Sequence, residues 1–202
     1  MVRIPICALV LLLLASCTAW AATVTLTCDE LSADLDGVTV KGVTFGFTGG
    51  DAMYGTLSGP GPVAGYFDPR NIEGSTAGTL TMTFAQATTS LEFCGAMDKA
   101  VQSINPAFYV QLWGLGEQLI GNYTMGVTKQ PNDGEFPVGK FTYSGTLVGR
   151  VVVTFNTTIE CPRFAIDNVK YDGTYVVPEP STFLPLLCGL AGITSLAWRR
   201  RR

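Results

Sequence analysis

Apolar and polar side chains alternate through most of the chain between residues 23 and 172, which is the period of half-buried β-strands. The alternation is clearest in Thr23–Thr27, Leu80–Phe84, Phe108–Trp113 and Val151–Phe155. Clusters of Gly, Pro, Asn and Asp separate such segments, and no long stretch repeats with a helical period. The pattern predicts an all-β fold of about nine or ten strands, a β-sandwich of jelly-roll type.

Breaks in the alternation predict the connections between strands. The apolar parity shifts at Lys41-Gly42, which predicts a bulge or tight turn there. Leu115–Gln118 predicts a hairpin turn, and Ala96–Val101 predicts a single helical turn. Phe141–Tyr143 and Val151–Phe155 are predicted to belong to two successive strands.

The first 21 residues have the pattern of a secretory signal peptide. Arg3 supplies a short basic region, Ile6–Ala15 an apolar one, and Ala19-Trp20-Ala21 the small residues that a signal peptidase recognises. Cleavage after Ala21 would start the exported chain at residue 22. Leu14-Ala15-Ser16-Cys17 also fits a lipoprotein box with Cys17 as the lipidated residue, and this alternative stays open.

The last 26 residues, 177–202, combine three features in a fixed order. Pro178-Glu179-Pro180 comes first, and Phe183–Trp198 follows as an uncharged apolar run of 16 residues. Four arginines end the chain: Arg199, Arg200, Arg201 and Arg202. The apolar run is close to the roughly 20 residues that span a bilayer, and flanking arginines stay on the cytoplasmic side. We therefore predict a transmembrane helix that holds residues 22–176 outside as one domain.

This ordered combination resembles the PEP-CTERM sorting signal of Gram-negative bacteria. The resemblance implies an exported precursor that the C-terminal helix anchors in the inner membrane and that an exosortase processes at or near Pro178–Pro180. It also implies a final location at the cell surface or in the extracellular matrix, in association with exopolysaccharide.

Composition limits the chemistry of the exported part. Residues 22–177 carry 8 basic and 15 acidic side chains, a net charge of −7 that argues against nucleic-acid binding. The chain has no histidine, which excludes Ser-His-Asp and Cys-His catalysis and histidine metal sites. The carboxylates are scattered, and Asp133 and Glu135 flank a turn glycine. We expect no enzyme, with a carboxylate-dependent glycoside hydrolase as a minor alternative.

Three cysteines lie in the exported part: Cys28, Cys94 and Cys161. An oxidising compartment favours one disulfide among them. Antiparallel pairing of the first and last strands would bring Cys28 close to Cys161, and we predict this pair.

Exposed aromatic side chains can stack on sugar rings. Tyr109, Gln111 and Trp113 share one face of a predicted strand, with an amide between two aromatic rings, and are candidates for sugar contact. The alternative is that the two aromatic side chains only pack one side of a sheet.

The strand pattern is also similar to the carbohydrate-binding-like sandwiches of PEP-CTERM proteins. The likeness rests on F-Y-V-Q-L-W-G at 108–114, R-V-V-V-T-F at 150–155 and F-A-I-D-N-V-K-Y at 164–171. It implies carbohydrate binding and a structural calcium held by Asp167 in the last strand together with Asp29 near the first. The alternative is that Asp167 only ends or turns its strand.

Overall fold

The computed structural model describes residues 22–28, 30–31, 36–49, 54–56, 62–131, 133–158 and 163–173. Within these ranges every regular element is a strand. The strands are β1 (Ala22–Leu26), β2 (Thr39–Val40), β3 (Val43–Thr48), β4 (Tyr54–Thr56), β5 (Asn71–Ser75), β6 (Thr79–Met97), β7 (Ser103–Trp113), β8 (Leu119–Gln130), β9 (Asp133–Phe155) and β10 (Arg163–Gly173). The all-β prediction is confirmed.

The predicted signal peptide (1–21) and the predicted membrane anchor (183–198) lie outside the described residues. In the part of the chain that is described, no helix is long and apolar enough to cross a membrane.

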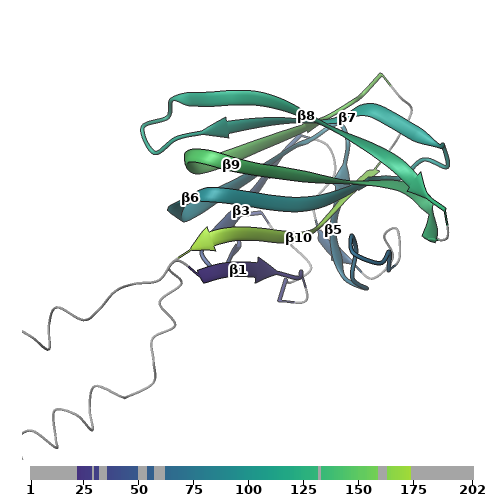
Figure 1. The fold of residues 1–202 in the computed structure, drawn as a ribbon, viewed down its shortest axis with the longest axis horizontal. Helices are drawn as coiled ribbons and strands as arrows, with labels where there is room; N and C mark the ends of the chain where they lie inside the picture. Colours follow the sequence, from purple (N-terminus) through teal and green to yellow (C-terminus); the bar gives the residue numbers. More distant parts are fainter. Residues whose placement is uncertain are drawn as a thin grey trace, which may run out of the picture.

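All strand pairs are antiparallel, and the main order is β4-β5-β10-β6-β9-β7-β8. The sheet folds back on itself because β6 and β9 are long enough to belong to two layers (Figure 1). The β7 layer contains β2, β3, β7 and β8 with the start of β6 and the end of β9. The β10 layer contains β1, β4, β5 and β10 with the remainder of β6 and β9.

The long strands β6 and β9 bend where their pairing with each other is irregular. Thr83 lies opposite Arg150 and Thr88 opposite Val148, so five steps along β6 stand against two along β9. Such extra residues bend a strand and increase its twist. The two layers agree with the predicted β-sandwich, and its jelly-roll type stays a prediction.

The structure corrects the prediction of two successive strands at this bend and the prediction of one helical turn elsewhere. Phe141–Tyr143 and Val151–Phe155 belong to the single strand β9, because the ladder with β6 resumes after the irregular pairing. The helical turn predicted at Ala96–Val101 is absent, since β6 continues through Ala96 and Met97, which pair with β10.

Two turn predictions were right. Lys41 and Gly42 have φ of 47° and 81°, and they connect β2 to β3 as a tight hairpin turn. Positive φ at both positions is the backbone that a type I′ two-residue hairpin turn requires. Gly114 N donates to Gln118 O at 2.9 Å, which closes the predicted turn between β7 and β8.

The core lies between the inner faces of the two layers. Phe155 of the β7 layer stacks on Phe164 of the β10 layer, with ring centroids 3.9 Å apart, and Phe84 packs on Tyr171 at 5.1 Å. A Cβ added to Gly95 would lie 2.6 Å from Met125 Cε, so the layers also meet there closely. Each buried Phe contributes roughly 1.5–3 kcal/mol to folding, and these contacts hold the layers together.

Both ends of the described domain leave at one corner. Ala22 of β1 lies opposite Gly173 of β10, and Leu26 lies opposite Val169. In Figure 1 this corner lies at the bottom of the domain, and β8 is at the opposite edge. The antiparallel pairing of the first and last strands, on which the Cys28–Cys161 prediction depends, is therefore present.

Candidate functional site

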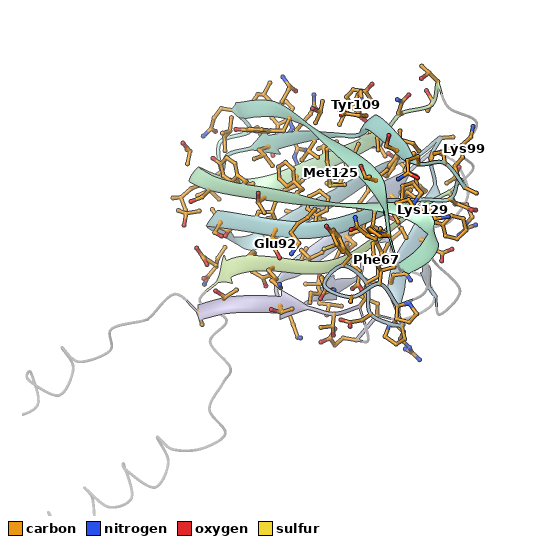
Figure 2. All side chains as sticks on the ribbon, turned by 45° about the vertical axis from the view of Figure 1, so that its right-hand side comes forward. Phe67, Glu92, Lys99, Tyr109, Met125 and Lys129 are labelled. Carbon is orange, nitrogen blue, oxygen red and sulfur yellow. The ribbon has the colours of Figure 1, made fainter. Side chains whose placement is uncertain are left out.

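The three candidate sugar contacts share one face of β7. Tyr109, Gln111 and Trp113 point outward, and the intervening Val110 and Leu112 are buried in the core. The alternation that predicted a common face is therefore confirmed. Figure 2 shows Tyr109 at the upper extreme of the domain, far from Phe67 and Glu92 on the other layer.

Small and hydroxylated side chains surround this face. The register places these residues beside the β7 candidates or in line with them across the layer: Asn122 and Thr124 of β8, Arg150, Val152 and Thr154 of β9, Thr81 and Thr83 of β6, and Thr44 and Gly46 of β3. Because most of these side chains are short, the surface is shallow and rich in hydroxyl groups. We call it the threonine face.

Trp113 is less available than Tyr109. The Arg150 guanidinium lies 5.1 Å from the centroid of the Trp113 ring, and Arg150 also forms an ion pair with Glu117. Trp113 Nε1 is buried, whereas Tyr109 is 40% exposed. Because the Arg150 cation covers one face of the Trp113 ring, Tyr109 has the more accessible aromatic ring of the two.

Gln111 is held in place by an amide pair. Its Nε2 donates to Asn122 Oδ1 at 3.0 Å across the β7–β8 ladder. The pair keeps Gln111 Oε1 as an acceptor and Asn122 Nδ2 as a donor outside this hydrogen bond, and both groups can bind a hydroxyl.

Asp167, the candidate calcium ligand, is fully buried on the outer side of the β10 layer. Its Oδ2 accepts from the backbone N–H of Asp68 at 2.7 Å, and its Oδ1 accepts from that of Asn168 at 2.6 Å. Asn168 Nδ2 donates to Tyr66 O at 3.0 Å. The bonds to Asp68 and Tyr66 fasten the segment 62–70 to β10.

Burial is the largest influence on the pKa values of Asp167 and its neighbour Cys28. Desolvation raises the pKa of Asp167 to about 6, although the hydrogen bonds from Asp68 and Asn168 N–H lower it. Cys28, placed beside Asp167 by the β1–β10 pairing, has its own pKa raised by burial and then by the Asp167 charge. A thiol held protonated in this way is a poor nucleophile.

Several predicted partners of these residues are not described. Asp29, the second predicted calcium ligand, and Cys161, the predicted disulfide partner of the buried Cys28, lie outside the described residues, so both predictions stay open. Glu30 forms an ion pair with Lys41. The described ranges contain no group of three Cys, Asp or Glu side chains placed to hold a metal. The side chains of Asp133 and Glu135 are not described either.

Sequence reasoning missed that segment 62–70 covers the outer side of the β10 layer. Val63 and Phe67 pair by an isolated bridge and pack on Cys94, Ala96, Val138 and Ala165 as a second, smaller core. Burial there raises the pKa of the Cys94 thiol to about 11. The only sequence signal was that outward positions of β6, β9 and β10 hold small or apolar residues rather than polar ones.

The uncovered part of the β10 layer carries charge. Glu92 lies between Lys140 and Lys170, with Oε1–Nζ distances of 3.2 and 3.0 Å. Partial burial raises the pKa of Glu92, but the hydrogen bonds from Lys170 and Lys140 outweigh it and leave that pKa lowered. The ion pairs of Glu92 with Lys140 and Lys170 make this part of the β10 layer a charged surface.

The architecture defines the class of the domain as an antiparallel β-sandwich. The K2 cleaved adhesin domain of Lys-gingipain has a similar fold, with a TM-score of 0.51 at 11% identity over 75% of this chain and 98% of that one. Weaker likenesses include the K1 cleaved adhesin domain of Lys-gingipain from Porphyromonas gingivalis W83 (TM-score 0.44, 12% identity, 75% and 98%). Another is the CBM22-1 xylan-binding domain of Paenibacillus barcinonensis Xyn10C (TM-score 0.42, 10% identity, 75% and 94%).

The tail gives the more particular assignment. Residues 176–202 match the PEP-CTERM protein-sorting motif, which confirms that resemblance. Such a motif indicates an exported precursor that is anchored in the membrane and processed by an exosortase. No curated protein matches the chain in sequence. Pro178-Glu179-Pro180 and the four terminal arginines lie outside the described residues.

Proposed function

We propose that this chain is a non-catalytic protein of the cell surface or extracellular matrix that binds exopolysaccharide through its threonine face. The observation that carries the proposal is the arrangement of Tyr109, Gln111 and Trp113 on one open face of a domain that bears a sorting motif. The scattered carboxylates and the absence of histidine support a binding role over a catalytic one.

The face offers the two kinds of contact that a sugar needs. The exposed Tyr109 ring stacks on an apolar sugar face, while Gln111, Asn122 and the neighbouring threonine hydroxyls hydrogen-bond to hydroxyl groups. Arg150 fixes the orientation of Trp113 at one end of the row. A shallow surface of this kind suits a long chain that crosses the strands, since it makes many weak contacts.

Affinity electrophoresis of the released protein through gels that contain the host's exopolysaccharide tests this proposal. Tyr109→Ala is expected to weaken binding about tenfold, equivalent to ~1.4 kcal/mol. Tyr66→Ala, a tyrosine of the opposite layer, serves as the matched control and is expected to bind normally. Equal retardation of wild type and Tyr109→Ala, or equal loss in both variants, contradicts the assignment of the face.

Processing at the tail is tested separately. Deletion of Pro178–Pro180, or replacement of Glu179, is expected to leave the precursor in the membrane fraction at full length. Replacement of Ser181, just outside the Pro-Glu-Pro, is the control. Normal release of the deletion variant would remove exosortase sorting from the proposal.

A structural calcium is the second part of this proposal. Asp167 is a buried carboxylate beside Cys28, and Asp29 follows Cys28 in the sequence. Thermal unfolding of the released protein with calcium and with a chelator tests it. An unchanged midpoint of unfolding would argue that Asp167 serves only to fasten segment 62–70.

A further inference from the structure

β8 is a strand with a neighbour on one side only over most of its length. It pairs with β7 from Leu119 to Thr128, and with β9 at Thr128 and Gln130, where the Gly126 carbonyl also lies against Gly139 of β9. Among the described strands, nothing pairs with the other side of β8 between Leu119 and Met125. A strand edge of this kind presents a row of backbone N–H and C=O groups to its surroundings.

This edge lacks the charges and prolines that protect many strand edges, and its one irregularity before Met125 is the register shift between Leu119 and Gly121. Leu119–Thr128 contains no charged residue and no proline. Natural edges carry lysines, prolines or bulges, or are very short. Other peripheral strands of this domain are short, since β2 has two residues, β4 has three and β1 has five. β8, with twelve residues, is therefore the exception.

The side chains of β8 also offer contact area. Tyr123 packs edge-on against Phe141 and Tyr143, with centroid distances of 6.0 and 5.8 Å, and still exposes 37% of its surface. Asn122 and Thr124 are exposed on the threonine face of the same strand. The edge therefore combines a partly exposed aromatic side chain with small polar side chains.

We propose that β8 pairs antiparallel with β8 of a second copy of this chain, which joins two β7 layers into one continuous sheet. The net charge of −7 in the exported part makes copies repel each other except where the contact is neutral, and β8 is such a stretch. A two-fold axis at Tyr123 places Asn122 opposite Thr124 of the other copy, an amide against a hydroxyl. The edge is thus complementary to itself, as a two-fold interface requires.

The position of the chain ends determines when this pairing forms. β8 lies at the edge opposite the β1–β10 corner from which both termini leave (Figure 1). A two-fold axis normal to the sheet then places the two corners at opposite ends of the dimer. Two precursors anchored in one membrane by residues 177–202 face the same way, so the dimer forms after release. The same axis keeps both Tyr109 side chains on one side of the joined sheet.

Light scattering coupled to gel filtration of the released protein, without polysaccharide, tests the proposal. Wild type is expected to elute with twice the mass of one chain at high concentration. Thr124→Lys places positive charges at the junction and is expected to raise the dimer dissociation constant at least tenfold. Thr83→Lys is the matched control, an exposed threonine of the same face on the central strand β6, and is expected to leave the dimer intact.

Hydrogen exchange provides the second readout. In the dimer, amides on the free side of β8 between residues 119 and 125 are expected to exchange more slowly as concentration rises. A monomer at every concentration, a dimer that Thr124→Lys leaves intact, or equal loss in the two lysine variants overturns the proposal. A complex with a different protein in place of the second copy also overturns it. Since no polysaccharide is present, these results are independent of the sugar-binding test.

Discussion

The outer faces of the two layers are built from the same alternating strands but have opposite characters. On the β7 layer, outward positions hold threonines, amides and Tyr109, and they stay open. On the β10 layer, outward positions hold Cys94, Ala96, Val138 and Ala165 beneath segment 62–70, together with the buried Asp167. The difference makes the outer side of the β10 layer a second core, whereas the outer side of the β7 layer is accessible for the binding that we propose.

Hydrogen bonding follows the same division. The closed face depends on a few strong, buried contacts that converge on one carboxylate, so it fails when one group is removed. The open face has many weak, exposed groups, so no single substitution there destabilises the fold by much. Four measurements can break or sharpen this comparison.

The largest effect is expected from Asp167→Ala. The substitution leaves the partly buried N–H groups of Asp68 and Asn168 without their acceptor, which costs about 2–4 kcal/mol of unfolding free energy. Denaturant unfolding measures it, with Thr154→Ala of the open face as the control. A loss below about 0.5 kcal/mol would show that segment 62–70 does not depend on this carboxylate.

The pH dependence of stability is the next largest effect. Because burial raises the folded-state pKa of Asp167 to about 6 from the ordinary 3.8, the folded protein binds the proton more tightly than the unfolded chain. Its contribution to stability is fully present below about pH 4 and is lost as pH rises through about 6, a decrease of about 3 kcal/mol. Unfolding free energies between pH 4 and 7 test this for wild type.

The control for the pH dependence is Asp167→Asn, which cannot ionise. Its stability is expected to be lower at every pH and to lose the decline between pH 4 and 6. A direct carboxyl titration by NMR follows the same proton in wild type. A titration midpoint at the ordinary value would contradict the effect of burial.

A smaller effect is expected from Glu92→Gln. The substitution removes ion pairs with Lys140 and Lys170 on a partly exposed surface, where such pairs contribute about 0.5–1 kcal/mol and are screened by salt. The loss is expected to shrink at about 1 M salt. Glu117→Gln is the matched control on the β7 layer, where the carboxylate is more exposed. A loss that salt leaves unchanged would indicate that the Glu92 group acts through packing instead.

The smallest effect is expected from Tyr109→Ala on stability. Because the side chain is 40% exposed and lies on the open face, the unfolding free energy should change by less than about 0.5 kcal/mol. Thermal and denaturant unfolding of the variant measure this change. A larger loss would mean that the threonine face contributes to folding as the covered face does.

The local patterns of this protein follow from its sequence alone. Period-two alternation defines the strands and the common face of Tyr109, Gln111 and Trp113, because successive side chains in a strand point to opposite sides. Lys41-Gly42 and Leu115–Gln118 predict their turns for reasons that involve only neighbouring residues. The sorting motif at 176–202 is likewise a property of consecutive residues.

Contacts between distant segments were decided only by the tertiary structure. β6 and β9 each continue through a bend because the opposite strand pairs on both sides of it, which no local pattern reveals. Asp167 is buried because Asp68, 99 residues earlier in the chain, crosses over it and donates a hydrogen bond. The unprotected side of β8 appears only when the strand order is known, since being at an edge depends on which strands are absent beside it.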